Sequence, residues 1–201
     1  MVQMEKFRFL VLLLVVVLLA QNTDATVCDF EDMTFGATYN VGGSFTTSGV
    51  VVTAGEFFLL PSGSITTGYA RVENGSQAGG AGNGILTNNI NLSFDFGLPC
   101  DGLALQYGVT GGGNINLEIN GSLANVVDFA SLPSSLGGTS VFTTPSNPGA
   151  LVVMGTVNSF KIGGQELCID NIVASVIPEP ATIMLLGIGG LMTLTRKRRS
   201  A

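Results

Sequence analysis

Oxygen-bearing side chains gather at two places that lie far apart in the sequence. Asp29, Glu31 and Asp32 follow the first apolar run after the N-terminal segment, and Asp170 and Asn171 interrupt the last one before the C-terminal segment. If the first and last strands are neighbours, these oxygens could meet around one cation. Calcium takes six to eight oxygen ligands from carboxylates, amides and backbone carbonyls. The four acids are therefore candidate calcium ligands; the alternative is solvated carboxylates at strand ends.

One group of ring and amide side chains could bind sugar. Tyr107 ends a predicted strand, and Asn114 and Asn116 lie on one side of the next predicted strand. A tyrosine ring offers an apolar face for stacking and a hydroxyl for hydrogen bonding. These residues form a candidate ligand face; the alternative is a ring half-buried at a strand end.

The composition argues against several kinds of site. The chain contains no His and no Trp, which removes imidazole bases and His-based triads. Between the terminal segments only Arg71 and Lys161 face eleven acidic residues, so the net charge there is two minus eleven, −9. Nucleic-acid binding needs clustered cations, so we expect no nucleic-acid partner. Because the usual nucleophile–base pairs are missing, we expect a protein that is not an enzyme.

Between the terminal segments, apolar residues recur at every second position. Residues 89–96 and 114–120 alternate in this way, and Asn120-Gly121 is a strong hairpin signal. About ten or eleven such short segments are separated by turn-rich spacers, and the stretch 75–84 is predicted to be a loop. The pattern predicts an all-β protein with one β-sandwich domain over residues 26–176. The simplest arrangement is jelly-roll-like, with a barrel as the alternative.

The N-terminal segment has the features of a secretory signal peptide. Lys6 and Arg8 precede an apolar run that ends at Ala20, and polar and small residues follow. The run is shorter than the ~20 residues that span a bilayer comfortably. We therefore predict a signal helix within residues 1–25 and cleavage after Ala25. Cleavage after Ala20 and an uncleaved anchor are the alternatives.

The C-terminal segment, residues 177–201, has three parts. A rigid tripeptide is followed by an apolar run over residues 181–195, a predicted transmembrane helix, and by a basic stop over residues 196–199. Prolines keep the tripeptide extended, and the positive-inside bias holds the basic stop in the cytoplasm. The residues concerned are Pro178, Glu179, Pro180, Arg196, Lys197, Arg198 and Arg199. Together they resemble the PEP-CTERM sorting signal of exported bacterial proteins; a plain membrane anchor would not account for the Pro-Glu-Pro spacing.

The PEP-CTERM resemblance implies a partner and a destination. Proteins that carry this signal are recognised by an exosortase, a membrane protease-transpeptidase, in systems that accompany exopolysaccharide production. The resemblance implies an inner-membrane intermediate, followed by the cell surface or the extracellular matrix. It further implies a non-enzymatic surface or matrix protein associated with polysaccharide.

A second, shorter resemblance implies an alternative function. The segments 29–32 and 167–172 are similar to the terminal strands of carbohydrate-binding jelly rolls, which often hold a structural calcium there. The alternative is therefore a carbohydrate-binding module with a structural calcium ion.

Three cysteines, Cys28, Cys100 and Cys168, are present. An exported protein folds in an oxidising compartment, so one disulfide can form and one thiol is left over. If the first and last strands pair, Cys28 and Cys168 could be bridged. This bridge would stabilise the fold by about 4 kcal/mol in the chain-entropy model.

Overall fold

The computed structural model describes residues 25–59, 64–66, 68–111 and 113–176, and most of these residues are in β-strands. The predicted transmembrane helix and all of the predicted signal helix except Ala25 lie outside these residues. Within the described part of the chain, no helix has the length and hydropathy needed to cross a membrane. The elements are β1 (Ala25–Cys28), β2 (Thr38–Asn40), β3 (Ser44–Thr47), β4 (Val50–Leu59), β5 (Ser64–Thr66), β6 (Tyr69–Asn74), the 3₁₀ helix η1 (Gly75–Ala78), β7 (Asn83–Asn88), β8 (Ile90–Asp95), β9 (Cys100–Val109), β10 (Ile115–Ile119), β11 (Ser122–Val126), the 3₁₀ helix η2 (Phe129–Ser131), β12 (Ser135–Leu136), β13 (Thr139–Thr143), β14 (Gly149–Val157), β15 (Phe160–Gly164) and β16 (Leu167–Val176).

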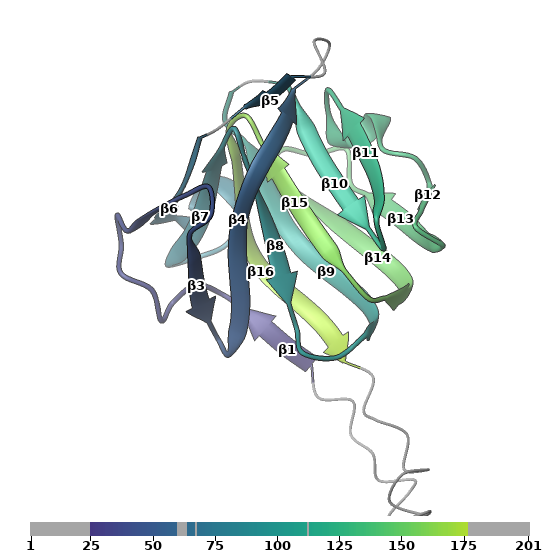
Figure 1. The fold of residues 1–201 in the computed structure, drawn as a ribbon, viewed down its shortest axis with the longest axis horizontal. Coiled ribbons are helices and arrows are strands. Elements are labelled where there is room, and N and C mark those ends of the chain that lie inside the picture. Colours follow the sequence, from purple (N-terminus) through teal and green to yellow (C-terminus); the bar gives the residue numbers. More distant parts are fainter. Residues whose placement is uncertain (1–24, 60–63, 67, 112, 177–201) are drawn as a thin grey trace, which may run out of the picture. The chain divides into compact units, whose positions relative to one another are not determined.

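The strands form two antiparallel sheets, one in front of the other in Figure 1. Counted over the described residues, sheet A has nine strands in the order β12-β13-β14-β9-β16-β7-β6-β2, with β1 paired to β16. Sheet B has seven strands in the order β11-β10-β15-β8-β4-β3, with β5 paired to β4. From β7 to β10, and again from β14 to β16, successive strands alternate between the two sheets.

One apolar core lies between the sheets. Leu117 and Ile162 from sheet B and Leu105 and Ile169 from sheet A are buried in the same cluster. Residues at alternate positions of a strand share one face. The period-two pattern of apolar residues therefore gives each sheet one apolar face, and the two apolar faces pack together. The prediction of an all-strand, sandwich-like body is confirmed.

The hairpin between β10 and β11 forms where the sequence contains a specific turn signal. Asn120 and Gly121 have φ angles of 52° and 77°, and Ile119 lies opposite Ser122. This is the hairpin predicted from Asn-Gly, because both central positions of such a turn need positive φ. At the ends of the body, Val27 of β1 lies opposite Val173 of β16, so the first and last strands are neighbours.

The structure departs from the sequence prediction at the glycine-rich stretch 75–84. Instead of one loop, residues 75–78 form η1 and residues 83–88 form β7, which lies between β6 and β16. The shortest strands were also not predicted, since two to four residues give too few alternations to reveal a period of two. These are β2, β3, β5 and β12.

Candidate functional site

Asp170 is buried in strand β16, with 1% of its surface exposed. It lies opposite Gln106 of β9, whereas Val173 lies opposite Ala104, so β16 contains one more residue than its partner over this span. Asn171, at φ 50°, is part of this irregularity. A β-bulge of this kind re-aims the neighbouring side chains. Alternation along β16 already places Asp170 on the face opposite Leu167 and Ile169, and the bulge after it returns Ile172 to the core between the sheets.

A glycine-rich segment, which we call the glycine loop (Gly75–Gly82), covers the Asp170 carboxylate. A methyl group at Gly80 would lie 1.8 Å from Asp170 Oδ2, and one at Gly75 would lie 2.4 Å from the same atom. Neither position has room for a side chain, so the loop backbone approaches the carboxylate directly. The loop residues were not predicted as part of a site; their high glycine content was the available signal.

Glu31 contacts the same loop. Its Oε1 accepts a hydrogen bond from the backbone N–H of Asn83 at 2.8 Å. A methyl group at Gly82 would lie 1.8 Å from Oε1. Glu31 follows β1, which pairs with β16, so the pairing of the first and last strands carries this carboxylate toward Asp170.

The surroundings of Asp170 disfavour its negative charge. Burial raises the pKa of Asp170 to about 6. The N–H of Asn171 donates a hydrogen bond to Oδ1 at 2.7 Å, and this bond lowers the pKa of Asp170. The negative charges of Glu31 and Asp29 raise the pKa further. Oδ2 is buried and has no hydrogen-bond partner among the described residues.

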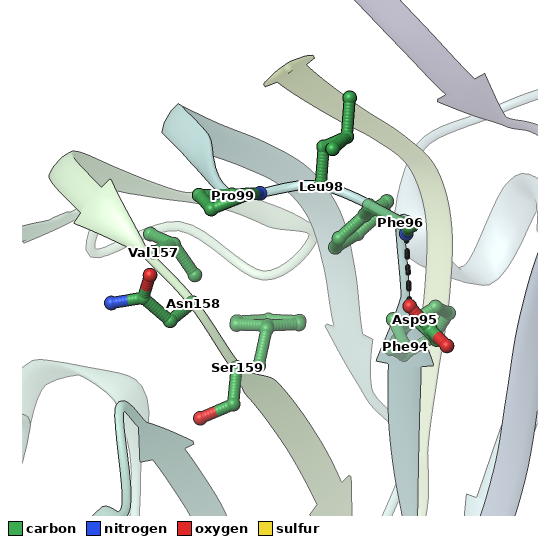
Figure 2. Close-up of a pocket in the computed structure, with 10 residues that line it drawn as sticks. Phe94, Asp95, Phe96, Leu98, Pro99, Val157, Asn158 and Ser159 are labelled. Atoms are coloured by element: carbon green, nitrogen blue, oxygen red, sulfur yellow. Dashed lines mark hydrogen bonds between the residues drawn. The ribbon is translucent and has the colours of Figure 1, made fainter. Parts of the chain in front are cut away.

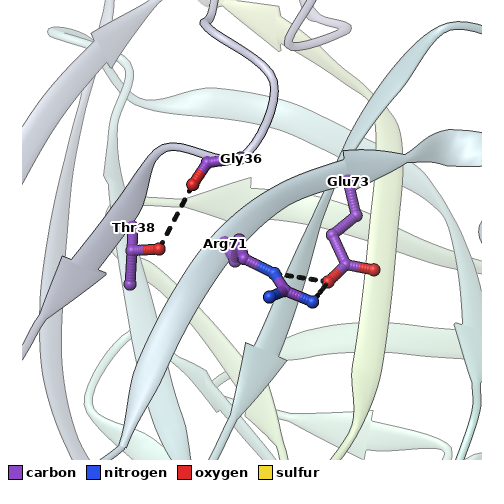
Figure 3. Close-up of polar contacts among 4 residues, drawn as sticks. All are labelled: Gly36, Thr38, Arg71 and Glu73. Carbon is purple, nitrogen blue, oxygen red and sulfur yellow. Dashed lines mark hydrogen bonds and ion pairs between the residues drawn. The ribbon is translucent and has the colours of Figure 1, made fainter.

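The two basic residues of the body pair with other acids. Arg71 binds Glu73, its neighbour on β6, and Nε donates at 2.6 Å (Figure 3). Lys161 Nζ donates to Glu118 Oε2 at 2.9 Å between β15 and β10 of sheet B. Neither pair includes Asp170, so no ion pair of the described residues offsets its buried charge.

The four-carboxylate calcium site predicted from the sequence is not formed. Asp32 accepts hydrogen bonds from the Ser48 N–H at 2.8 Å and from Thr47 Oγ1 at 2.7 Å, and both lower the pKa of Asp32. Asp29 Oδ1 accepts a hydrogen bond from the Glu31 N–H at 3.2 Å. Across the described ranges, no three Asp, Glu, Cys or His side chains are grouped so that they could hold a metal ion.

Two of the four predicted ligands, Asp170 and Glu31, lie against the same glycine loop. Asp170 Oδ2 is buried without a partner among the described residues, and Glu31 binds the N–H of Asn83 at the end of the loop.

The sugar-binding face predicted from the sequence is also not formed. Tyr107 is 3% exposed in sheet A, and its ring lies on that of Phe129 with 3.5 Å between centroids. Its phenol donates a hydrogen bond to the Thr144 carbonyl at 2.7 Å. Asn114 immediately precedes β10 of sheet B, and Asn116 within β10 is 1% exposed. The three predicted residues therefore lie on different sheets, and two of them are buried.

The predicted bridge between Cys28 and Cys168 is wrong. All three cysteines are free thiols and all are buried. Cys28 lies opposite Ile172, four residues along β16 from Cys168. At about 3.3 Å per residue, Ile172 lies about 13 Å from Cys168 along the strand, and Cys28 is at least as far from Cys168. A disulfide requires Cα atoms within about 7 Å of each other.

A row of amides crosses sheet B and was not predicted as a group. Asn125 lies opposite Asn116, Asn116 opposite Gly163, and Gly163 opposite Asn91. Asn125 and Asn91 donate hydrogen bonds to backbone carbonyls of β4 at 2.8 and 2.7 Å. Their side-chain oxygens, and both polar atoms of Asn116, are buried without a partner among the described residues. The alternation of apolar residues predicts which face of its strand Asn116 occupies. The alignment of Asn125, Asn116 and Asn91 in one row depends on the register between strands, which the sequence does not show.

A small cavity of about 150 Å³ lies beyond the ends of β8 and β15, where aromatic side chains line it (Figure 2). The rings of Phe94 and Phe160 are tilted by 46° to each other, with centroids 6.0 Å apart. Asp95, the acid in the lining, accepts a hydrogen bond from the Gly97 N–H at 2.8 Å. The lining residues offer polar and apolar surface in similar amounts and no pair of acid and base.

The predicted sorting residues Pro178, Glu179 and Pro180, and the basic stop 196–199, lie outside the described residues. The last described residue, Val176, ends β16 and lies opposite Cys100. The first described residue, Ala25, lies opposite Ser175 at the same end of the body, and cleavage after Ala25 would shorten β1 by one residue.

Comparison with known families bears on this C-terminal segment. Residues 176–199 match the model of the PEP-CTERM protein-sorting motif. The match covers the Pro-Glu-Pro tripeptide, the apolar run and the basic stop, and it indicates an exported protein processed by an exosortase, which is a membrane protein. No curated protein matches the chain.

Proposed function

We propose that this protein is a non-enzymatic component of the cell surface or extracellular matrix, delivered there by exosortase-dependent sorting and associated with exopolysaccharide. The observation that carries the proposal is the sorting motif at residues 176–199, which begins at the last residue of the final strand. A folded body followed directly by such a motif can be exported and then separated from the membrane by one cleavage near Pro178-Glu179-Pro180.

The body suits a structural role because several residues that were predicted as ligands hold the fold instead. The predicted ligand residue Tyr107 is packed in the core, and Asp32 closes the turn between β3 and β4. We further propose that the body is jelly-roll-like. The alternation of successive strands between sheets, with the orders β7-β16-β9-β14 and β8-β15-β10-β11, supports this arrangement.

Sorting is tested in a bacterium that contains an exosortase, by following the size and location of the protein. The wild-type chain is expected to lose its C-terminal segment and to leave the inner membrane. The variant with both Pro178→Ala and Pro180→Ala, and the variant Glu179→Gln, should accumulate at full length in the membrane fraction. Glu166→Gln removes a charge from the body and serves as the matched control. Wild-type protein that keeps its C-terminus in the membrane, whatever residues occupy 178–180, would refute the proposal.

Association with polysaccharide is tested separately. Co-sedimentation of the processed protein with exopolysaccharide from the same cells, compared with cells that make none, measures it directly. Because Tyr107 is buried, Tyr107→Phe should leave co-sedimentation unchanged. The carbohydrate-binding alternative therefore has no assigned sugar-contacting residue, and the proposal concerns location rather than a defined sugar site.

A further inference from the structure

Apolar side chains form a continuous row across the outer face of sheet A, which points away from the core. The strands β13, β14, β9, β16 and β1 each contribute one residue, and each residue lies opposite the next: Phe142, Val152, Ala104, Val173 and Val27. Ala104 is partly buried, whereas the other four are exposed. We call these five residues the apolar row. Single exposed apolar residues are normal on a protein surface, but a contiguous set marks an interaction site.

The surroundings of the apolar row are uncharged. Two residues along each strand, the same face carries Ser140, Met154, Gly102, Ser175 and Ala25. Neither set contains a charged side chain, although the net charge between the terminal segments is −9. On the other side of the row, η1 covers the sheet where Ala78 packs on Leu86 and Cys168. The open part of the face is therefore an apolar strip at the end where β1 begins and β16 ends.

The apolar row is nearly the same when it is read from either end. Ala104 lies at its centre, with a valine on each side. A two-fold axis through Ala104, parallel to the strands, would place Val152 on Val173 of a second copy. The same axis would place Phe142 on Val27 of that copy. An interface between identical chains requires such a self-complementary surface. Because the strip is uncharged, two acidic bodies could meet there without opposing carboxylates.

The same two-fold axis suits chains that are attached to one membrane. Rotation about an axis parallel to the strands leaves the strand direction unchanged, so the carboxyl ends of β16 point the same way in both copies. The match to the sorting motif begins at Val176, the last residue of β16. Both C-terminal segments can therefore enter the same membrane while the two bodies are in contact.

We propose that the apolar row is the contact between two copies of this protein, which pair through the outer faces of sheet A. Five strands about 4.8 Å apart make the row about 20 Å wide, and the strip covers on the order of 300 Å². A stable complex buries about 800 Å² on each partner. The pairing should therefore be weak in dilute solution and should form where membrane attachment concentrates the copies. This inference goes beyond the proposed function, because it concerns the body and requires no cleavage.

The test uses the full-length chain in membranes of cells that export it but contain no exosortase. Ala104→Cys places a thiol on the proposed axis, and a short bifunctional maleimide should link two copies into a dimer on denaturing electrophoresis. Ser93→Cys is the matched control, because Ser93 is also partly buried but lies on the outer face of sheet B, and it should give several times less dimer. The three native thiols are buried, so their reaction would reveal a misfolded variant.

The direction of pairing is tested with thiols on either side of Ala104. One copy carries Val152→Cys and the other, with a different tag, carries Val173→Cys. Their cross-linking should exceed that between two copies with the same substitution. In the two-fold arrangement, identical thiols are displaced by two strand spacings, about 10 Å. Equal cross-linking in all pairings would overturn the two-fold arrangement.

Two substitutions in the Ala104→Cys chain should break the contact. Val152→Glu should lower the dimer yield about tenfold, because pairing would bury an unpaired charge. Phe142→Ser should also lower the yield, by removing the largest side chain of the row. Thr53→Glu, at an exposed position on sheet B, is the control and should leave the yield unchanged.

The proposal is overturned if Ala104→Cys gives no more dimer than Ser93→Cys, which is the result expected if a lipid surface covers the row. It is also overturned if Val152→Glu and Phe142→Ser both leave the dimer yield unchanged. Because the cells contain no exosortase, neither result bears on processing at Pro178-Glu179-Pro180. The two proposals therefore fail independently.

Discussion

Cys28 and Cys168 belong to two different apolar clusters, although both are fully buried and their strands are hydrogen-bonded to each other. Cys28 packs in the core between the sheets, whereas Cys168 packs against Ala78 and Leu86 under the glycine loop. Two thiols in separate clusters cannot meet without unfolding part of sheet A. The fold therefore does not depend on a disulfide between its first and last strands.

The three thiols should be inaccessible in the native protein and reactive after unfolding. Burial raises the pKa of Cys28 to about 12 and that of Cys168 to about 11, with nearby acids adding to both shifts. Because the thiolate is the reactive form, the native chain should react very slowly with a thiol reagent at pH 8. Denaturation without a reductant should expose three reactive thiols per chain. Only one reactive thiol after denaturation would show that a disulfide exists.

Tyr107 should contribute to stability rather than to ligand binding. Tyr107→Phe removes the hydrogen bond to the Thr144 carbonyl and should lower the free energy of unfolding by about 1 kcal/mol. Tyr107→Ala also removes the packing on Phe129 and should cost about 3–5 kcal/mol. Urea unfolding measures both values. Tyr69→Phe is the control, since Tyr69 is only partly buried, and a loss as large as that of Tyr107→Phe would contradict this account.

Gly108 is expected to hold the glycine loop close to sheet A. A methyl group at Gly108 would lie 1.8 Å from the backbone oxygen of Gln77 in η1. Gly108→Ala must displace this segment and should destabilise the protein by about 1–3 kcal/mol.

Gly55→Ala is the matched control for Gly108→Ala. The nearest atom to a methyl group at Gly55 is 4.0 Å away, so the substitution should be neutral or stabilise by up to about 1 kcal/mol. Equal unfolding free energies for the two variants would contradict the close contact at Gly108.

Asp128 should stabilise the fold only when it is ionised. Its Oδ1 accepts a hydrogen bond from the Ser131 N–H at 2.8 Å at the start of η2, and the side chain and backbone of Ser131 lower the pKa of Asp128. A carboxyl whose pKa is lower in the folded state stabilises above its unfolded pKa of about 3.9. That contribution disappears as the pH falls through the folded pKa.

The pH dependence of Asp128→Ala checks this assignment. The variant should unfold at a lower temperature than the wild type at neutral pH, and the difference should shrink in acid as the wild-type carboxyl becomes protonated. Asp101→Ala, at an exposed position in β9, should show no comparable pH-dependent difference. A difference for Asp128→Ala that stays constant with pH would mean that the charge does not matter.

Much of the fold follows from local signals that act independently of the rest of the chain. The alternation of Ile115, Leu117 and Ile119 is enough to place them on one buried face, and Asn120-Gly121 is enough to turn the chain. The prediction of a loop over residues 75–84 was wrong in part, because the glycines of this stretch allow close contact with Asp170 and sheet A. That requirement comes from neighbours distant in the sequence.

The candidate sites also divide into those that depend on local sequence signals and those that depend on contacts between distant segments. The PEP-CTERM motif is a linear signal whose parts are contiguous, so the sequence alone identified it within residues 177–201, and the family match covers residues 176–199. The acids Glu31 and Asp170 could be nominated from the sequence, but only the fold shows that both lie against the glycine loop, while Asp32 binds Thr47 and Ser48. Residue type and spacing thus determined the sorting signal and the two-sheet body, because these depend on interactions within a few residues. Which buried carboxylate lacks a partner, which thiols are apart and which glycines cover a charge depend on strand register, and register exists only once the whole chain has folded.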